Sequence, residues 1–300
     1  MKHIAFLLCE GPHDVAFLSR ILKTKGFNVY SKKLSEYPKP IDKFIMGHIQ
    51  SLAIEDMNLE ELRNRPMPSE ALTFGNQLFL LYSMHGDSKK ELRQDMIRKI
   101  KDLIPKDADE ISGIEDLHLS IVYFFDADEK GVYSRLIEIK KEIADVLAFP
   151  VNSGYFETNA SIHIIKQIIF GAYIFARNDQ KGKLEDILMP LMIKDNEDIF
   201  NKANDYLLLK NENRLRKLKI FHENENIVEK RTSKKMTFDL KKSAIGVAGQ
   251  LQNSGKSNVV IIKDCDYITL EKIQNSDECC IILDFFEQLL NKMKSQSVLE

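Results

Sequence analysis

Short apolar runs and stretches of helical spacing alternate along the first half of the chain. The run "HIAFLLC" ends at Glu10 and a turn at Gly11 and Pro12, and the apolar residues that follow recur three and four positions apart. The runs "NQLFLLYSMHG" and "LHLSIVYFF" are likewise followed by helical spacing, over about 88–103 and in "GVYSRLIEIKKEIADVL". Continuous apolar runs predict buried strands, and the wider spacing predicts helices. This alternation predicts an α/β fold with a mostly parallel sheet flanked by helices.

The second half of the chain has a less regular pattern. "SIHIIKQIIFGAYIFA" predicts one long strand or two, and "NVVIIKDCDYITL" predicts a further strand. Helices are predicted in "GKLEDILMPLM", in "NEDIFNKANDYLLL" and finally in "CCIILDFFEQLLNKMK". Residues 38–70 carry prolines around a helical centre, so we interpret them as a helical insertion and not as part of the sheet. The predicted domains are a core over 1–150 and an α+β C-terminal extension over 151–300 that completes the site.

Composition describes an ordinary globular protein. The 300 residues are 44% hydrophobic, which is enough for a full core. The 43 basic and 45 acidic residues nearly cancel, so attraction to nucleic acid depends on local patches such as the basic segment 210–242. Four cysteines without zinc-pair or disulfide-framework spacing indicate a reducing compartment. The apolar runs are too short for a signal peptide or a membrane span, which predicts a cytoplasmic protein with no membrane partner.

Two aspartates, Asp126 and Asp128, follow the apolar run "SIVYFF". Side chains two positions apart point the same way if the strand persists through them. Like charges held together repel unless a cation lies between them, and oxygen ligands suit Mg2+ or Mn2+. Glu10 also follows a predicted strand, and parallel strands present their carboxyl ends at one edge of a sheet. The sequence therefore predicts that three carboxylates converge there.

Three other interpretations use the same residues. A calcium-binding EF-hand loop that begins at Asp126 needs ligands at its fifth and twelfth positions, which are Lys130 and Ile137, so this site is excluded. A phosphatase of the haloacid dehalogenase type normally has Thr or Val where Lys130 stands, and its aspartate pair lies near the start of the fold. Capping of the following helix is the purely structural alternative.

The motifs "CEGPHD" and "DADEKG" each follow a predicted strand and precede a predicted helix. In this order and context they resemble the TOPRIM family, the catalytic domain shared by topoisomerases, primases and small nucleases. The motif residues are Glu10, Gly11, Asp14, Asp126, Asp128 and Gly131. The resemblance covers roughly residues 1–150 and implies a TOPRIM-like fold, Mg2+ or Mn2+ as cofactor, and cleavage of phosphodiester bonds.

The resemblance also implies roles for the acidic residues. Glu10 is expected to be a metal ligand or a general base, and Asp126 and Asp128 are expected to be metal ligands. Asp14 lies in the first turn of a predicted helix, where binding of a second metal and stabilisation of the helix end are equally open.

Two downstream segments, "KGKLEDILMPLM" and "KKSAIGVAGQLQ", resemble the Leu-Glu and lysine motifs of the overcoming-lysogenization-defect nucleases. This resemblance implies that Glu185 is a further metal ligand and that Lys242 stabilises charge on the phosphate. A solvated acid and a surface lysine are the alternatives, and the adjacent Lys241 is able to exchange roles with Lys242. Gly11 and Gly131 are expected to permit tight turns beside the ions.

The leading functional hypothesis is a magnesium-dependent TOPRIM nuclease that acts on DNA or RNA. The chain has no Gly-rich phosphate loop, so the second hypothesis is a regulatory or binding subunit that depends on a partner ATPase, as in phage defence. The third is a metal-dependent phosphatase or nucleotidyl transferase, and a homo-oligomer is open under all three. His13 and His85, at predicted strand ends, are interpreted as hydrogen-bonded surface residues.

Overall fold

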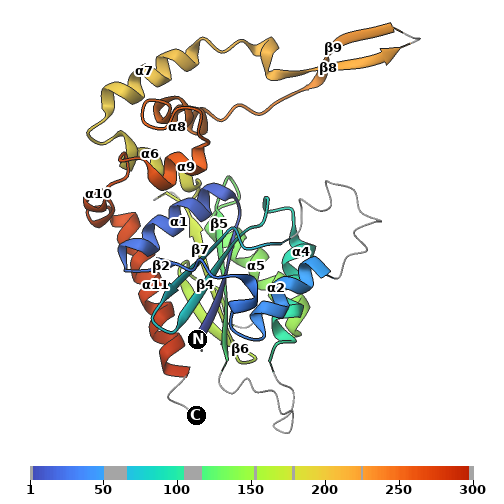
Figure 1. Ribbon diagram of the computed structural model, residues 1–300, viewed down its shortest axis with the longest axis vertical. Coiled ribbons are helices and arrows are strands. Elements are labelled where there is room, and N and C mark those ends of the chain that lie inside the picture. Colours follow the sequence, from blue (N-terminus) through green and yellow to red (C-terminus); the bar gives the residue numbers. More distant parts are fainter. Residues whose placement is uncertain are drawn as a thin grey trace. The chain divides into compact units, whose positions relative to one another are not determined.

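A computed structural model describes residues 3–50, 66–104, 117–151, 154–177, 180–223 and 226–296. The chain forms two compact units (Figure 1). The first unit is Met1–Ile187 with Thr269–Glu300, and the second is Leu188–Ile268. This division differs from the predicted boundary at residue 150, because two strands beyond that position extend the sheet of the first unit and the last helix returns to it.

The first unit contains a seven-stranded sheet in the order β2-β3-β4-β1-β5-β7-β6. Its strands are β1 His3–Cys9, β2 Asn28–Val29, β3 Glu70–Phe74, β4 Gln77–Ser83, β5 His118–Asp126, β6 Ser161–Ile165 and β7 Ile168–Phe175. The four central strands β4, β1, β5 and β7 are parallel, and the strands beyond them at both edges are antiparallel. The predicted α/β fold with a mostly parallel sheet is therefore confirmed.

Helices cover both faces of this sheet (Figure 1). They are α1 Pro12–Thr24 and α11 Asp277–Gln296 on one face, and α2 Ile41–Gln50, α4 Lys90–Lys101 and α5 Val132–Leu147 on the other. Phe124 of β5 lies against Phe285 and Phe286 of α11, whereas the next residue, Phe125, lies under Arg93 of α4. Both faces of the central strands are buried, which explains why these strands are continuous apolar runs.

Two segments differ in detail from the sequence prediction. "SIHIIKQIIFGAYIFA" forms two strands, β6 and β7, because Lys166 and Gln167 between them adopt left-handed φ values of 47° and 70°, as a tight hairpin turn requires. The predicted insertion 38–70 has its helical centre in α2, but Glu70 begins β3 and is part of the sheet. Residues 51–65 of the insertion lie outside the described residues.

The second unit combines helices with a two-stranded ribbon. Its elements are α7 Glu197–Leu208, the 3-10 helix η3 Glu212–Leu215, β8 Arg216–Glu223, β9 Asn226–Lys235, α8 Leu240–Gly249 and α9 Asn258–Asp264. Helix α6 Leu184–Ile193 runs from the first unit into the second, and the short elements η1 Leu34–Glu36 and α10 Leu270–Gln274 belong to the first. The described helices include none that is long and apolar enough to cross a membrane.

The predicted strand in "NVVIIKDCDYITL" is wrong, because its first seven residues form α9. The β-branched run favours a strand by local propensity, but Ile261 and Ile262 are buried when the segment is helical. Gly249 of α8 makes this packing close, since a Cβ atom at this glycine would overlap the Ile261 side chain. Packing against α8 therefore decides the structure of this segment.

Gly249→Ala is expected to destabilise the protein by about 1–3 kcal/mol, because the added methyl group meets Ile261. Adding Ile261→Ala removes the obstacle, so the double variant is expected to lose less than the sum of the two single losses. Gly47→Ala in α2 is the matched control. A Cβ there meets nothing within 4 Å, and stability is expected to stay unchanged or rise by up to about 1 kcal/mol. Additive losses in urea unfolding would contradict this account of the α8–α9 contact.

Candidate functional site

The carboxyl ends of β1, β5 and β7 meet at one edge of the sheet, because these three strands are parallel neighbours. Glu10 directly follows β1, and Asp126 is the last residue of β5. The backbone N–H of Asp126 donates a hydrogen bond of 3.1 Å to Glu10 Oε2. The structure therefore brings together Glu10 and Asp126, two of the three carboxylates that the sequence predicts to converge.

A third segment reaches the same edge at the start of α6. The backbone N–H of Leu184 donates a hydrogen bond of 2.8 Å to Asp126 Oδ1. This N–H is one of the donors that a helix leaves without an intrahelical partner, so a carboxylate is a favourable acceptor for it. The next residue is Glu185, which is 1% exposed.

The pKa of Asp126 is raised to about 9 by its surroundings. Burial is the largest cause, repulsion by Asp14, Glu10 and Glu185 acts in the same direction, and the hydrogen bond from the Leu184 N–H acts in the opposite direction. The four acidic residues Glu10, Asp14, Asp126 and Glu185 are called the carboxylate cluster below. A cluster of this kind favours the uptake of a proton or a cation.

Glu10 is perturbed in the same direction. Burial is again the largest cause that raises its pKa. The hydrogen bond from the Asp126 N–H and the charge of Arg135 both lower this pKa, whereas the charges of Asp128 and Asp87 raise it. Glu10 therefore lies between the carboxylate cluster and a second group of charges around Arg135.

Asp14 is 4% exposed in the first turn of α1. Its Oδ2 atom accepts a hydrogen bond of 2.6 Å from the Gly11 N–H, which agrees with one of the two roles left open for it, stabilisation of the helix end. Its charge also acts on Asp126. Gly11 itself has φ −142° and ψ 177°, an extended conformation that any residue adopts. The chain bends at Glu10 and Gly11, and this bend does not depend on the conformational freedom of glycine.

Glu185 pairs with a histidine that the sequence did not single out as functional. His13 Nδ1 lies 3.1 Å from Glu185 Oε1, and the two side chains are 18% and 2% exposed. His13 comes from the first turn of α1, next to Asp14, so this pair joins α1 to α6. The interpretation of His13 as a surface residue misses this contact.

Asp128 has a different environment from Asp126. Strand β5 ends at Asp126, and the backbone at Asp128 is left-handed with φ 48°. Its main chain pairs with Gly182 in both directions, through hydrogen bonds of 2.6 and 3.2 Å. Because the strand does not persist through both aspartates, strand alternation does not place their side chains on one face. Gly131 has φ 84° at the start of α5, which supports its predicted turn role.

Arg135 binds the Asp128 carboxylate and organises the outer part of this edge. Its buried guanidinium lies 2.8 Å from Asp128 Oδ2, 2.8 Å from Asp87 Oδ2 and 3.1 Å from Glu138 Oε2. Its Nε atom also donates a hydrogen bond of 2.9 Å to the Asp126 carbonyl oxygen. The sequence carries one signal for this residue, an arginine on the apolar face of a predicted helix, where a buried cation needs partners.

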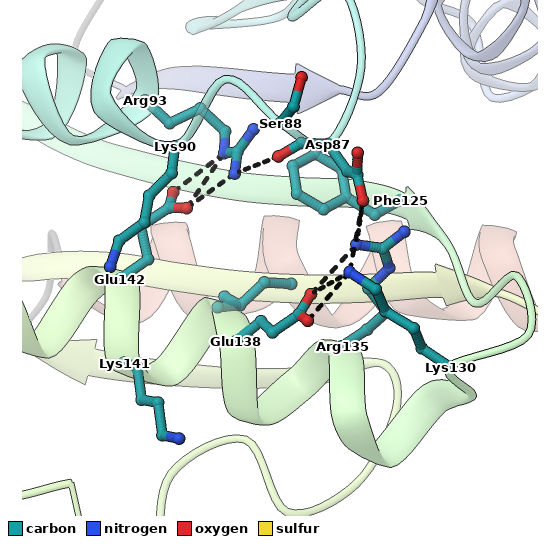
Figure 2. Close-up of a pocket in the computed structure, with 11 residues that line it drawn as sticks. Asp87, Ser88, Lys90, Arg93, Phe125, Lys130, Arg135, Glu138, Lys141 and Glu142 are labelled. Atoms are coloured by element: carbon teal, nitrogen blue, oxygen red, sulfur yellow. Dashed lines mark hydrogen bonds and ion pairs between the residues drawn. The ribbon is translucent and has the colours of Figure 1, made fainter.

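A cavity of about 470 Å³ lies beside Arg135, between α4 and α5 (Figure 2). Arg93 and Glu142 form one wall through a buried ion pair of 2.8 Å, and Tyr123 donates a further hydrogen bond of 2.9 Å to Glu142. Asp87 and Arg135 form a further part of the lining and are joined by an ion pair of 2.8 Å. The cavity therefore has a fixed, charged lining and shares Arg135 with Asp126 and Asp128.

Lys242 belongs to α8 of the second unit. Its backbone N–H donates a hydrogen bond of 3.0 Å to Asp239 Oδ1, which caps the helix, and its carbonyl oxygen accepts one of 2.7 Å from Asn258. The role of Lys242 in stabilising charge on a phosphate stays a prediction.

The carboxylate cluster has the donor chemistry of a metal site without the geometry of a preformed one. Over the described ranges, no group of three or more His, Cys, Asp or Glu side chains is arranged as a metal site. The donors do fit a hard divalent cation, since all four members of the cluster are carboxylates.

Comparisons with known proteins assign no activity. A family model described as "Protein of unknown function (DUF3226)" matches residues 4–291. None of the curated proteins matches the sequence. Among solved structures, a hypothetical protein from Pyrococcus horikoshii is similar over 97% of this chain and 99% of its own, at 13% identity and a TM-score of 0.45.

Asp126→Asn is expected to stabilise the protein at neutral pH, because the carboxylate is penalised in the folded state. The pKa of Asp126 rises from 3.8 to about 9 in the folded protein. As pH increases between these values, the unfolded chain loses the Asp126 proton and the folded protein keeps it, so the free energy of unfolding falls. Removing the penalty is expected to add roughly 1–3 kcal/mol to the free energy of unfolding near pH 7, and little near pH 4. Thermal melts from pH 4 to 9 measure this difference.

Asp284→Asn, on an exposed position of α11, is the matched control and is expected to show no such trend. A gain in melting temperature that is the same at pH 4 and pH 8 would contradict the raised pKa of Asp126.

Proposed function

The chain belongs to the DUF3226 family, and we propose that it is a Mg2+-dependent nuclease that cleaves phosphodiester bonds of DNA or RNA. The observation that carries the proposal is the meeting of Glu10, Asp126 and the start of α6 at the carboxyl edge of the parallel sheet, through the hydrogen bonds from the Asp126 N–H to Glu10 and from the Leu184 N–H to Asp126. Burial, and after it repulsion by Asp14 and Glu10, raises the pKa of Asp126 there. Ligands bind at this edge in open α/β sheets, and a divalent cation neutralises such a cluster. The order of the motifs "CEGPHD" and "DADEKG", which resembles the TOPRIM family, supports the same reaction.

Under this proposal the first metal ligands are Asp126 and Glu10, with Mn2+ able to replace Mg2+. A divalent cation in such a site supplies Lewis acidity toward a phosphate oxygen and a water nucleophile at neutral pH. Glu185 adds a third carboxylate, and His13 holds its Oε1 atom in place. Asp14 contributes negative charge to the site while one of its oxygens binds the Gly11 N–H.

Arg135 positions the backbone around these ligands. It binds the carbonyl oxygen of Asp126 and the carboxylate of Asp128, and therefore fixes the turn that carries both residues. Asp128 is 47% exposed and is engaged by Arg135, so it becomes a ligand only if this pair opens. For this reason we rank Asp128 after Glu10 and Asp126. Lys242 keeps its proposed role of stabilising negative charge on the phosphate.

The proposal is tested by incubating the full-length protein with Mg2+ or Mn2+ and supercoiled plasmid, single-stranded DNA or RNA. Cleavage is expected with at least one substrate and is expected to stop when EDTA is added. Glu10→Gln and Asp126→Asn are expected to lower the rate by at least about 100-fold, because each removes a charged ligand. Asp284→Asn is expected to leave the rate unchanged.

Metal binding is measured separately, so that an inactive preparation remains informative. Mn2+ is expected to raise the melting temperature of the wild-type protein and to release protons, and both effects are expected to be lost in Asp126→Asn. If Mn2+ binds but only a small chromogenic phosphodiester is hydrolysed, the nuclease proposal is replaced by a small-molecule phosphodiesterase. Equal cleavage by the wild type and Asp126→Asn would overturn the assignment of the site.

A further inference from the structure

We propose that the β8–β9 ribbon of the second unit binds duplex DNA, lying in the major groove with its lysines on the phosphate backbone. Figure 1 shows the ribbon extending away from α7 and α8 of its own unit. This inference deepens the proposed function, because it names duplex DNA as the substrate on which the proposed nuclease activity acts. It rests on features of the ribbon alone.

Cations face one another across the two strands of the ribbon. Lys219 lies opposite Lys230, and Arg216 lies opposite Lys235. Like charges directly opposite each other destabilise an antiparallel pair, and a two-stranded hairpin is only marginally stable by itself in water. The ribbon therefore presents cations from both of its strands, and such a surface suits an anionic ligand.

Several apolar side chains of the ribbon are exposed to solvent. Side chains alternate between faces, so the pair Phe221 and Val228 shares the face of Lys219 and Lys230. Phe221 is 38% exposed on that face. On the opposite face, the exposed apolar residues are Leu218 at 52%, Ile220 at 64% and Ile227 at 70%. Exposed apolar residues interleaved with cations are typical of binding surfaces.

Duplex DNA fits this ribbon in charge and in size. The duplex carries one negative charge per about 1.7 Å of its axis, which neutralises facing cations. Paired strands lie about 4.8 Å apart, and the major groove is about 12 Å wide, so it admits a two-stranded ribbon. The major groove of duplex RNA is too narrow for side chains to read, which favours DNA. Phe221 and Val228 supply apolar contacts of the kind made with thymine methyl groups.

The foot of the ribbon continues the cationic surface. A cavity of about 440 Å³ there is lined by Lys210, Lys235 and Phe238, among others. Lys210 Nζ lies 4.9 Å from the centre of the Phe238 ring, so the aromatic face and the cation are held together. This combination extends the surface available to a phosphate backbone beyond the two strands.

The test measures binding of the full-length protein to a 20-base-pair DNA duplex by fluorescence anisotropy in EDTA, where no metal-dependent cleavage occurs. Lys219→Gln/Lys230→Gln is expected to weaken binding by at least about tenfold near physiological salt. The slope of log K against log salt concentration is expected to fall by about 2, because each substituted lysine leaves one phosphate without its cation. Because this variant removes a repulsive pair, its melting temperature is expected to be unchanged or higher, which separates weakened binding from unfolding.

Two variants serve as controls. Lys32→Gln/Lys101→Gln replaces two exposed lysines of the first unit and so changes the net charge as much as the ribbon variant does. It is expected to bind the DNA duplex as tightly as the wild type. Leu218→Gln/Ile220→Gln, on the opposite face, is expected to retain most of the duplex affinity. A loss of affinity in the Lys32 and Lys101 variant equal to that of the ribbon variant would overturn the proposal, because overall charge would then explain the binding.

Other occupants of the ribbon give distinct results. The ribbon would be assigned to a second copy of this chain by two results together. Leu218→Gln/Ile220→Gln would change the molecular mass of the protein measured by light scattering, and Lys219→Gln/Lys230→Gln would leave DNA binding unchanged. Tighter binding to phosphatidylserine vesicles than to DNA would assign it to a membrane surface. Single-stranded DNA or duplex RNA bound as tightly as duplex DNA would overturn groove binding. Lys219→Gln/Lys230→Gln is expected to keep the rise in melting temperature that Mn2+ causes in the wild type, so failure of the ribbon and failure of the carboxylate cluster are distinguishable.

Discussion

Three hydrogen bonds at Asp126 hold the functional edge of the sheet together. The backbone N–H of Asp126 donates a hydrogen bond to the Glu10 carboxylate. The Asp126 Oδ1 atom accepts a hydrogen bond from the Leu184 N–H, and the Asp126 carbonyl oxygen accepts one from the Arg135 Nε–H. These bonds connect β5 to the end of β1, to the start of α6 and to α5. Each uses a different polar group of one residue, so the backbone and the side chain are both fixed. The same bonds leave the Asp126 carboxylate facing the negative charges of Asp14, Glu10 and Glu185.

Arg135 forms ion pairs with the outer carboxylates of this edge, Asp87 and Asp128, and not with the inner carboxylate of Asp126. Burial lowers the pKa of Arg135, but the hydrogen bond and the charge of Asp87 outweigh burial and keep it above its ordinary value, so the guanidinium stays charged. The outer carboxylates of Asp87 and Asp128 have this fixed cation as their partner, and the pKa of Asp87 is lowered by it. Asp126, on the inner side, keeps its raised pKa. The inner side therefore takes up a proton more readily than the outer side.

The sequence predicts the positions of those site residues that follow from the order of the strands. It does not predict the positions that depend on contacts between segments far apart in the chain. Glu10 and Asp126 end neighbouring parallel strands, so the apolar runs alone place them at one edge. The turn at Asp128 depends on pairing with Gly182, and no local pattern contains this pairing. The contact between His13 and Glu185 joins residues 172 positions apart, so it is equally invisible to a local pattern. Segment 258–264 has strand propensity, but burial against α8 makes it helical.

Two features of the chain bring like charges together, and they have opposite signs. The carboxylate cluster concentrates negative charge where burial raises the pKa of Asp126, and the ribbon places Lys219 directly across from Lys230. A hard divalent cation suits the first, and a polyanion suits the second. Under the proposed function one class of substrate answers to both, because a nucleic acid with its divalent counterions contains a polyanion and hard cations.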